Sequence, residues 1–156
     1  MAKEIVLADG RVALVSDEDY DFLKQWPWQR VGKYVGRNPS REESIYLHKI
    51  IGERMGLDPL QLIDHKDRNK LNNVRENLRQ ANKQQNKANS DIHCNNTSGY
   101  KGVSWHRRHR MWQAYIKINY KCVHIGYFAC PKQAAIAYNL EAKRYFGDFA
   151  LLNEVN

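Results

Sequence analysis

Three side chains in the middle of the chain have types and positions suited to hydrolysis of a phosphodiester. Asp64 and His65 are adjacent, and Asn86 follows further along the chain. This hydrolysis needs a water that is nucleophilic near neutral pH and a cation that offsets charge on the phosphate. Carboxylate and amide oxygens are hard ligands that suit Mg²⁺ or Mn²⁺, so we expect Asp64 and Asn86 to bind the ion. His65 is then predicted to deprotonate the water.

The chain around these residues must place two adjacent side chains in one site. Neighbouring residues of a strand point to opposite faces, so Asp64 and His65 can act together only where a strand ends or bulges. Leu62–Ile63 lead into the polar turn HKDRNKLNN, which predicts such an ending. Leu78 to Ala81 are then expected to form a second short strand and Asn82 to Asn89 a short helix.

The segment before the turn is predicted to be rich in strands. Asp9-Gly10 separates two apolar runs and favours a tight hairpin. Ser16 and the acids after it predict a helix N-terminus, followed by an apolar side that includes Leu23 and Trp26. A second strand pair is expected around residues 34–35 and 44–46. A short amphipathic helix of Leu47, Ile50, Ile51 and Met55 should then end near Gly56.

The pattern changes beyond the polar segment 90–98, which we interpret as a linker. Three runs rich in aromatic and β-branched residues, Tyr100–Trp105, Trp112–Ile118 and Val123–Phe128, predict a three-stranded antiparallel sheet. Pro131 begins a helix that Gly147 ends. Its predicted apolar stripe consists of Ala134, Ala135, Tyr138, Ala142 and Tyr145.

The basic character of the protein belongs to its second part. The chain has a formal charge of +8, and residues 61–156 carry sixteen Lys/Arg against seven Asp/Glu. No carboxylate occurs between Asp91 and Glu141. A surface of one sign attracts polyanions through counterion release, whereas a merely solvated surface usually mixes both signs. This distribution favours binding to nucleic acid.

The sequence YLHKIIGERMGL and the following IDHKDRNKLNNVRENLRQANKQQNKAN resemble the HNH, or ββα-metal, nucleases, particularly phage and intron-encoded homing enzymes. That family has an Asp-His pair on the first strand, an Asn in the long loop and another Asn on the helix. The resemblance implies that Asp64 and Asn86 bind Mg²⁺ or Mn²⁺ and that His65 is the general base. It implies that Asn77 holds the loop and orients the histidine. Singly, each residue also has a structural interpretation, such as ending a strand or capping a turn.

Other residues near the motif have less distinctive patterns. His48 lies beside apolar helix positions, and we favour a structural role over a ligand role. His93 and Cys94 resemble half of a metal site, but their spacing from Cys122, His124 and Cys130 fits no standard zinc pattern, and free thiols are expected. Five basic residues are predicted to contact phosphates around the cut: Lys66, Arg68, Lys70, Arg75 and Arg79.

A second resemblance covers about residues 96–153. The segments YKGVSW, WQAYIKI, HIGYF and AAIAYNLEAKRYFG, with Gly102 and Gly126, are similar to the plant Apetala/ethylene-response-factor DNA-binding domain, which also occurs fused to HNH nucleases in phages. That family lays its sheet in the major groove. The resemblance implies that the residues facing DNA are Lys101, Ser104, His106, Gln113, Tyr115, Lys117 and His124, with Arg107, Arg108 and Arg110 in the first hairpin.

Two departures from the plant pattern leave the target sequence open. Ser104 stands where arginine is usual, and His124 stands where the plant domain has tryptophan. Trp105 and Trp112 could stack on nucleic acid, but core packing is favoured for both.

Together these features predict an α+β protein. Residues 1–89 would form a ββα-metal nuclease domain with an N-terminal β-hairpin region, and residues 99–156 a three-stranded sheet packed on one helix. The main hypothesis is a homing endonuclease acting on double-stranded DNA, as a monomer or a homodimer. The alternatives are a sequence-specific regulator with an inactive nuclease shell and an RNA-binding structural protein. No apolar run suggests a membrane span or signal peptide, so a cytoplasmic location, that of the host cell for a phage protein, is expected.

Overall fold

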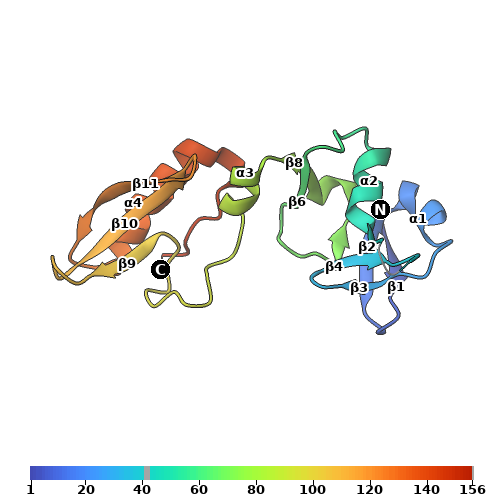
Figure 1. Ribbon diagram of the computed structural model, residues 1–156, viewed down its shortest axis with the longest axis horizontal. Coiled ribbons are helices and arrows are strands. Elements are labelled where there is room, and N and C mark those ends of the chain that lie inside the picture. The colour runs from blue at the N-terminus through green and yellow to red at the C-terminus, as the bar shows by residue number, and fades with distance from the viewer. Residues whose placement is uncertain (41–42, 156) are drawn as a thin grey trace. The chain divides into compact units, whose positions relative to one another are not determined.

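The computed structural model describes residues 1–40 and 43–155 (Figure 1). The chain folds as two compact units, Met1–Asn82 and Lys83–Asn156. The division falls before the short helix α3 (Lys83–Ala88), whereas the sequence pattern places the linker after it. Both units mix short strands with helices, as expected for an α+β protein.

The first unit opens with the predicted β-hairpin. Strand β1 (Ala2–Val6) pairs antiparallel with β2 (Val12–Ser16). Gly10 has a φ of 80°, a conformation that glycine adopts without steric cost. On its other edge, β2 pairs in parallel with the short strand β7 (Asn72–Asn73), an element that the sequence pattern does not predict. This pairing holds part of the polar turn, residues 65–73, against the β1–β2 hairpin.

A second small sheet and two helices complete the N-terminal part of this unit. Strands β3 (Gln29–Val31), β4 (Tyr34–Arg37) and β5 (Ile45–Tyr46) form an antiparallel sheet. The pairing of β4 with β5 confirms the expected strand pair, and β3 is an addition. Helices α1 (Asp17–Leu23) and α2 (Leu47–Arg54) occur as predicted, and α2 ends just before Gly56, whose φ is 73°.

Two antiparallel strands follow α2. Strand β6 (Leu62–His65) pairs with β8 (Leu78–Ala81). The loop between them contains β7 and a turn of 3-10 helix, η1 (Arg75–Asn77). The predicted strand, loop, strand, helix order is therefore present, with α3 as its helix.

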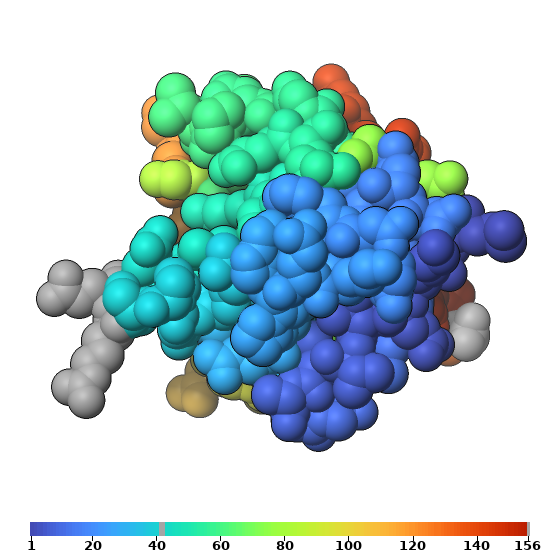
Figure 2. Space-filling view, turned by 90° about the vertical axis from the view of Figure 1, so that its right-hand side faces the viewer, coloured from blue at the N-terminus to red at the C-terminus, as the bar shows by residue number. Residues whose placement is uncertain are grey.

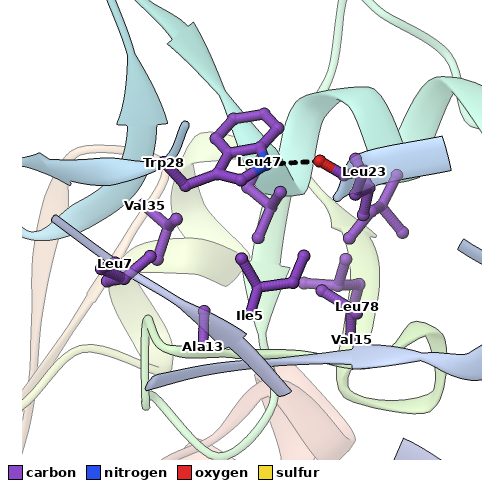
Figure 3. Packing of buried hydrophobic residues seen from close by; sticks show 10 residues of the cluster. Ile5, Leu7, Ala13, Val15, Leu23, Trp28, Val35, Leu47 and Leu78 are labelled. Carbon is purple, nitrogen blue, oxygen red and sulfur yellow. Dashed lines mark hydrogen bonds between the residues drawn. The ribbon is translucent and has the colours of Figure 1, made fainter. Parts of the chain in front are cut away.

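The core of the first unit gathers buried side chains from β1, β2, β4, β8, α1 and α2 (Figure 3). Ile5, Val15, Leu47 and Leu78 are among the buried residues that pack together. Trp28 is fully buried and donates its indole N–H to the carbonyl of Leu23 at 2.8 Å, so this tryptophan packs in the core with its polar group satisfied (Figure 3).

A buried carboxylate joins α1 to α2 and to η1. Asp19 is 0% exposed and accepts hydrogen bonds from Arg54 at 2.6 Å and from Arg75 at 2.7 and 2.8 Å. Burial alone would raise the pKa of Asp19, but the hydrogen bonds from the two arginines outweigh it and hold this pKa below its usual value. In Figure 2 the blue atoms of the α1 region lie beside the blue-green atoms of the α2 region.

These contacts correct two expectations. Arg75 was predicted to contact phosphates, but its guanidinium is engaged by Asp19 and by Glu18 at 2.9 Å. Ser16 was predicted to cap α1, but no hydrogen bond from its side chain caps that helix. The hydroxyl of Ser16 accepts the backbone N–H of Arg75 at 2.9 Å instead. Both side chains therefore fasten the loop that carries η1.

The second unit contains the predicted three-stranded sheet. Strand β10 (Met111–Ile118) is central and pairs antiparallel with β9 (Val103–His106) and β11 (Lys121–Phe128). Helix α4 (Pro131–Phe146) covers one face of the sheet, and a 3-10 turn, η2 (Gly147–Phe149), follows it. Figure 1 shows α4 running along β10 and β11.

Small residues let α4 approach the sheet closely. Ala134, Ala135, Ala142 and Tyr138 are buried, together with Ala114 of β10. Tyr138 lies directly over Gly102, where an added Cβ would come within 2.1 Å of its ring. The predicted stripe is correct except at its end: Tyr145 is exposed, and Phe146 is buried in its place.

No helix in the described part of the chain is long and apolar enough to span a membrane.

Candidate active site and the open face of the sheet

Strand β6 ends at the two residues that were predicted to act together. Asp64 and His65 are 1% and 0% exposed. The strand gives way to a turn because the backbone N–H of Arg68 bonds to the carbonyl of His65 at 3.0 Å and Arg68 has a φ of 66°. The expected strand ending is therefore confirmed.

Asp64 lies opposite Arg79 in the β6–β8 pair. The guanidinium of Arg79 donates two hydrogen bonds to one carboxylate oxygen of Asp64, at 3.0 and 2.9 Å. The side chain of Arg79 is only 14% exposed. Arg79 was predicted to contact phosphates, but its short bonds to a buried carboxylate show that it stabilises the charge of Asp64.

A chain of hydrogen bonds fixes the orientation of His65. Its Nε2 lies 3.0 Å from Oδ1 of Asn73. Asn73 Nδ2 donates in turn to the backbone carbonyl of Lys70 at 3.1 Å, which identifies Oδ1 as the atom facing the imidazole. An amide oxygen only accepts hydrogen bonds, so Nε2 carries the proton and Nδ1 has the lone pair. This tautomer is the one that a general base acting through Nδ1 requires.

Asn73 was not singled out from the sequence. It is 1% exposed and lies on β7, opposite Val15 of β2. Two asparagines in a polar turn give no indication of a strand. The parallel pairing with β2, which holds Asn73 in place, joins residues that are distant in the chain.

Asn77 holds the loop between β6 and β8. Its Oδ1 accepts the backbone N–H of Asp67 at 3.0 Å, and its Nδ2 donates to the Asp67 carboxylate at 2.8 Å and to the carbonyl of Asn72 at 2.7 Å. The backbone carbonyl of Asn77 accepts the N–H of Lys66 at 2.8 Å. The orienting hydrogen bond to His65 described above comes from Asn73, which lies next to the segment that Asn77 fastens.

Aromatic rings and a second histidine surround His65. The ring centroid of His48 lies 5.4 Å from that of His65, and the ring of Tyr34 packs against both imidazoles. His48 is buried, and its Nδ1 has no hydrogen-bond partner among the described residues. This placement agrees with the structural role expected for His48.

Burial keeps both histidines neutral. Desolvation, with smaller contributions from the nearby His65, Lys49 and Lys70, lowers the pKa of His48 to about 3. Desolvation also lowers the pKa of His65, and the hydrogen bond with Asn73 opposes this effect only in part. Neutral imidazole is the form that can accept a proton from water.

The predicted metal ligands come from different units. Asp64 lies on β6 of the first unit, and Asn86 lies partly exposed on α3 of the second. Within residues 1–40 and 43–155, no group of three or more His, Cys, Asp or Glu could hold a metal ion. A carboxylate oxygen and an amide oxygen are hard ligands of the kind that Mg²⁺ and Mn²⁺ prefer.

The strand register places most of the predicted DNA-facing residues on one face of the second sheet. Gln113 pairs with Ser104 across β9 and β10, and Gln113 Nε2 donates to the Ser104 hydroxyl at 2.9 Å. Tyr115 pairs with His124 across β10 and β11. We call this surface, opposite α4, the open face; its members are Ser104, His106, Gln113, Tyr115, Lys117, Cys122, His124 and Tyr127.

Tyr127 is a member of the open face that the sequence analysis missed. Its ring lies 5.2 Å from that of His106, 4.6 Å from His109 and 4.4 Å from His124. Simple alternation along β11 from His124 leads to Gly126 and Phe128 and therefore does not indicate Tyr127, which pairs directly with Gln113. A register shift between Ala114 and Tyr115 interrupts the alternation, so that Tyr127 lies on the same face as His124.

Three arginines and one lysine complete the set taken from the sequence. Arg107, Arg108 and Arg110 are exposed in the turn between β9 and β10. Lys101 departs from the expectation. Its ammonium donates to the backbone carbonyls of Ala88, the last residue of α3, at 2.5 Å and of Ser90, just beyond it, at 2.6 Å. The role of Lys101 is to cap this helix, because an ammonium satisfies carbonyls that have no intrahelical partner.

Trp105 and Trp112 contact each other edge to face, with centroids 5.3 Å apart. Trp112 packs against the core of the second unit, whereas Trp105 is 46% exposed. The three cysteines, Cys94, Cys122 and Cys130, are free thiols, as expected.

Comparison with known proteins identifies the family. The sequence profile described as HNH endonuclease matches residues 46–88, which contain α2, β6, the loop, β8 and α3. An uncharacterized HNH endonuclease of Acanthamoeba polyphaga mimivirus is 30% identical over 154 residues, covering 94% of this chain and 77% of that protein. This chain belongs to the HNH endonuclease family. Membership identifies it as a nuclease and therefore as a hydrolase, and HNH endonucleases generally use divalent metal ions.

A second relative matches a smaller part of this HNH endonuclease. Protein 3.8 of Escherichia phage T7 is 45% identical over 51 residues, which are 33% of this chain and 42% of that protein. No solved structure matches the chain significantly.

Proposed function

We propose that this HNH endonuclease hydrolyses phosphodiester bonds of double-stranded DNA with the help of Mg²⁺ or Mn²⁺. The observation that carries the proposal is the Lys70–Asn73–His65 hydrogen-bond chain, which presents Nδ1 of a neutral imidazole as proton acceptor next to Asp64. A base held in one tautomer and orientation is what general-base catalysis needs.

Each residue of the motif has a distinct task in the proposal. Asp64 and Asn86 would hold the divalent cation, which when bound supplies positive charge for the scissile phosphate and the leaving oxygen. His65 removes a proton from the attacking water at Nδ1. Asn73 orients the imidazole, and Asn77 fixes the loop that carries Asn73.

The burial of His65 adds a requirement. Because His65 is 0% exposed, a water or phosphate reaches Nδ1 only when a neighbouring side chain moves. The rings of Tyr34 and His48 contact His65. Substrate binding is therefore expected to be coupled to a small rearrangement of these side chains.

The second unit is proposed to hold the duplex. From Lys83 onward the chain carries eleven Lys/Arg and four Asp/Glu, and the open face presents amide, hydroxyl and imidazole groups that suit base edges. This arrangement supports an Apetala/ethylene-response-factor-like module at residues 99–156. A homing role in a mobile element is part of the proposal, and the two similar proteins come from a virus and a phage.

A regulator with an inactive nuclease shell is the second candidate. The observation in its favour is the pair of hydrogen bonds from Arg79 to Asp64, which compete with a cation for the carboxylate. The first candidate predicts that this ion pair rearranges when metal binds, and the second predicts that it persists.

The test is cleavage of duplex DNA by the full chain. The substrate should contain a site that the protein binds tightly, found by selection from a random duplex library in EDTA. We expect cleavage with Mg²⁺ or Mn²⁺, none in EDTA, and a loss of about 10²- to 10⁴-fold in His65→Ala. Binding of the site in EDTA should be unchanged by His65→Ala. Tight binding without cleavage in either metal would exclude the nuclease and leave the regulator.

A further inference from the structure

A cavity of about 320 Å³ lies within the second unit. Its walls are α3, the segment that follows it, the end of β10 with the β10–β11 turn, and α4. The lining residues that matter here are Tyr115, Tyr120, Lys83, Lys87, Lys101 and Lys117. Small-molecule sites in proteins start at about this volume.

Two tyrosines, Tyr115 and Tyr120, are among the residues that line the cavity. Tyr115 lies on the open face and is 37% exposed, and Tyr120 is 81% exposed at the β10–β11 turn. Asn119 and Tyr120 form the two-residue turn between Ile118 and Lys121, with φ angles of 48° and 64°. Glycine is the usual residue at the second position of such a turn. Tyr120 therefore keeps a bulky ring in solvent with a positive φ, a conformation that a glycine would adopt with less strain.

The turn is fastened to the opposite wall of the cavity. The backbone N–H of Asn119 donates to Oε1 of Gln84, on α3, at 2.7 Å. Helix α3 is itself held by Lys101, whose ammonium bonds to the carbonyls of Ala88 and Ser90. The two walls are therefore kept at a fixed separation, as a preformed site requires.

Positive charge surrounds the aromatic rings. Lys83 and Lys87 extend from α3 and Lys117 from β10, and all three are exposed. Asp91 adds one carboxylate to the lining. The cavity therefore combines flat apolar surfaces with excess cationic charge, which matches a ligand that has a planar ring and a phosphate.

We propose that this cavity holds one unstacked nucleotide of a DNA strand. Its base would lie against Tyr115 and Tyr120, and its phosphate near Lys83 or Lys87. The inference rests on the proposed function in that it needs the second unit to contact DNA. Tyr115 and Lys117 belong to both the open face and the cavity, so a strand that crosses the open face passes the entrance. Stacking on aromatic rings tolerates any base, and a nucleotide held in this way marks a melted or nicked strand.

The experiment measures binding of a fluorescein-labelled single-stranded dT10 oligonucleotide to the full chain in EDTA, by anisotropy. The decisive variant is Tyr120→Gly, which removes the ring and relieves the positive φ, so the fold should be kept. We expect it to bind dT10 about tenfold more weakly, with an unchanged or higher melting temperature. Tyr145→Ala is the control, because Tyr145 is exposed on α4 and lies outside the cavity lining. It should bind dT10 like the wild type.

Two further measurements distinguish a DNA strand from a free nucleotide as the ligand. Lys87→Ala should lower the salt slope of dT10 binding by roughly 0.7, the contribution of one phosphate contact on a single strand. Free dAMP should compete with dT10 only weakly. Wild-type affinity in Tyr120→Gly overturns the proposal, and dAMP that competes as well as the oligonucleotide overturns its assignment to a DNA strand. The binding measurements are made in EDTA without a divalent metal. A failure of duplex cleavage would therefore leave the results for Tyr120→Gly and for dAMP unaffected.

Discussion

The loop between β6 and β8 and the open face of the second sheet use similar polar residues in opposite ways. At the end of β6 and in the loop that follows it, Asp64, His65 and Asn73 are buried, and each has a hydrogen-bond partner within the unit. On the open face, Tyr115, Lys117 and His124 are exposed. The difference lies in how many protein partners a side chain has before any substrate arrives.

This contrast follows from what each region is proposed to do. A catalytic base must be held in one tautomer before the reaction, and a buried network provides that order. A surface that binds DNA needs groups left accessible to base edges and phosphates. Substitutions in the loop should therefore change stability and turnover, and substitutions on the second unit should change binding and its salt dependence.

The largest effect is expected from Asp19→Ala in the first unit. This change leaves Arg54 and Arg75 without their buried carboxylate and should cost about 3–5 kcal/mol of unfolding free energy. Because the pKa of Asp19 is held below its usual value, the stability that it contributes is present at neutral pH and is lost as the pH falls through the lowered pKa. Urea unfolding measures the difference.

Asp148→Ala is the matched control for this change. Asp148 pairs with Lys143 at 2.8 Å on the surface of the second unit, and its side chain is 90% exposed. An exposed pair of this kind should contribute less than about 1 kcal/mol. Equal losses in the two variants would contradict the distinction between a buried and an exposed ion pair.

Asn73→Ala tests the orienting role in the loop. Turnover on duplex DNA should fall about 10- to 100-fold, the usual effect of removing a residue that orients a catalytic group. Asn73→Asp keeps an acceptor for Nε2–H but stabilises the charged imidazolium. It should therefore raise the pKa of His65 and move the acid limb of the pH–rate profile to higher pH.

Asn72→Ala serves as the neighbouring control, because the Asn72 side chain donates to Asp67 in the loop at 2.7 Å. We expect a smaller loss of turnover and no shift of the pH profile. A profile that stays in place in Asn73→Asp would show that Asn73 acts on folding alone.

The two buried histidines predict that the first unit loses stability in mild acid. The pKa of His48 is about 3 when folded, against about 6.5 when unfolded. The unfolded state therefore binds a proton first, and stability is lost as the pH falls from 6.5 towards 3. From pH 7 to pH 5 the loss from His48 should be about 2 kcal/mol. In His48→Gln the difference between urea midpoints at these two pH values should shrink, and an unchanged difference would refute the assignment.

The smallest effect is expected on the open surface of the second unit. Arg107→Ala combined with Arg108→Ala should lower the slope of log affinity against log salt by about 1.8, since each phosphate contact on duplex DNA contributes about 0.9. Arg30→Ala on β3 combined with Lys33→Ala in the β3–β4 turn of the first unit is the matched control and should leave the slope unchanged. The slope is measured from binding isotherms at about 50 to 200 mM salt, because the affinity changes strongly over this range.

The elements with local signals were predictable from the sequence. Asp9-Gly10 marks the hairpin, Pro131 and Gly147 bound α4, and the alternating runs around them predict β9, β10 and β11. These signals depend on residues within a few positions of one another, so no knowledge of tertiary contacts is needed.

The parts that could not be predicted depend on long-range pairing. Asn73 reaches His65 only because β7 pairs in parallel with β2. Arg79 meets Asp64 only through the register of β6 and β8. The hydrogen bonds of Lys101 could not be predicted either. Its partners are the backbone carbonyls of Ala88 and Ser90, and a sequence pattern does not show which backbone atoms a side chain will contact.

The contact made by Lys101 has a consequence for the history of the protein. The ammonium of Lys101 bonds to main-chain carbonyls, and these bonds place no demand on the side chains of the helix that it caps. A sheet module that carries such a lysine could be joined by recombination behind a different nuclease and still fasten that enzyme's last helix. A small residue at the position of Ala88, which is buried against the sheet module, would be the main compatibility requirement at the junction.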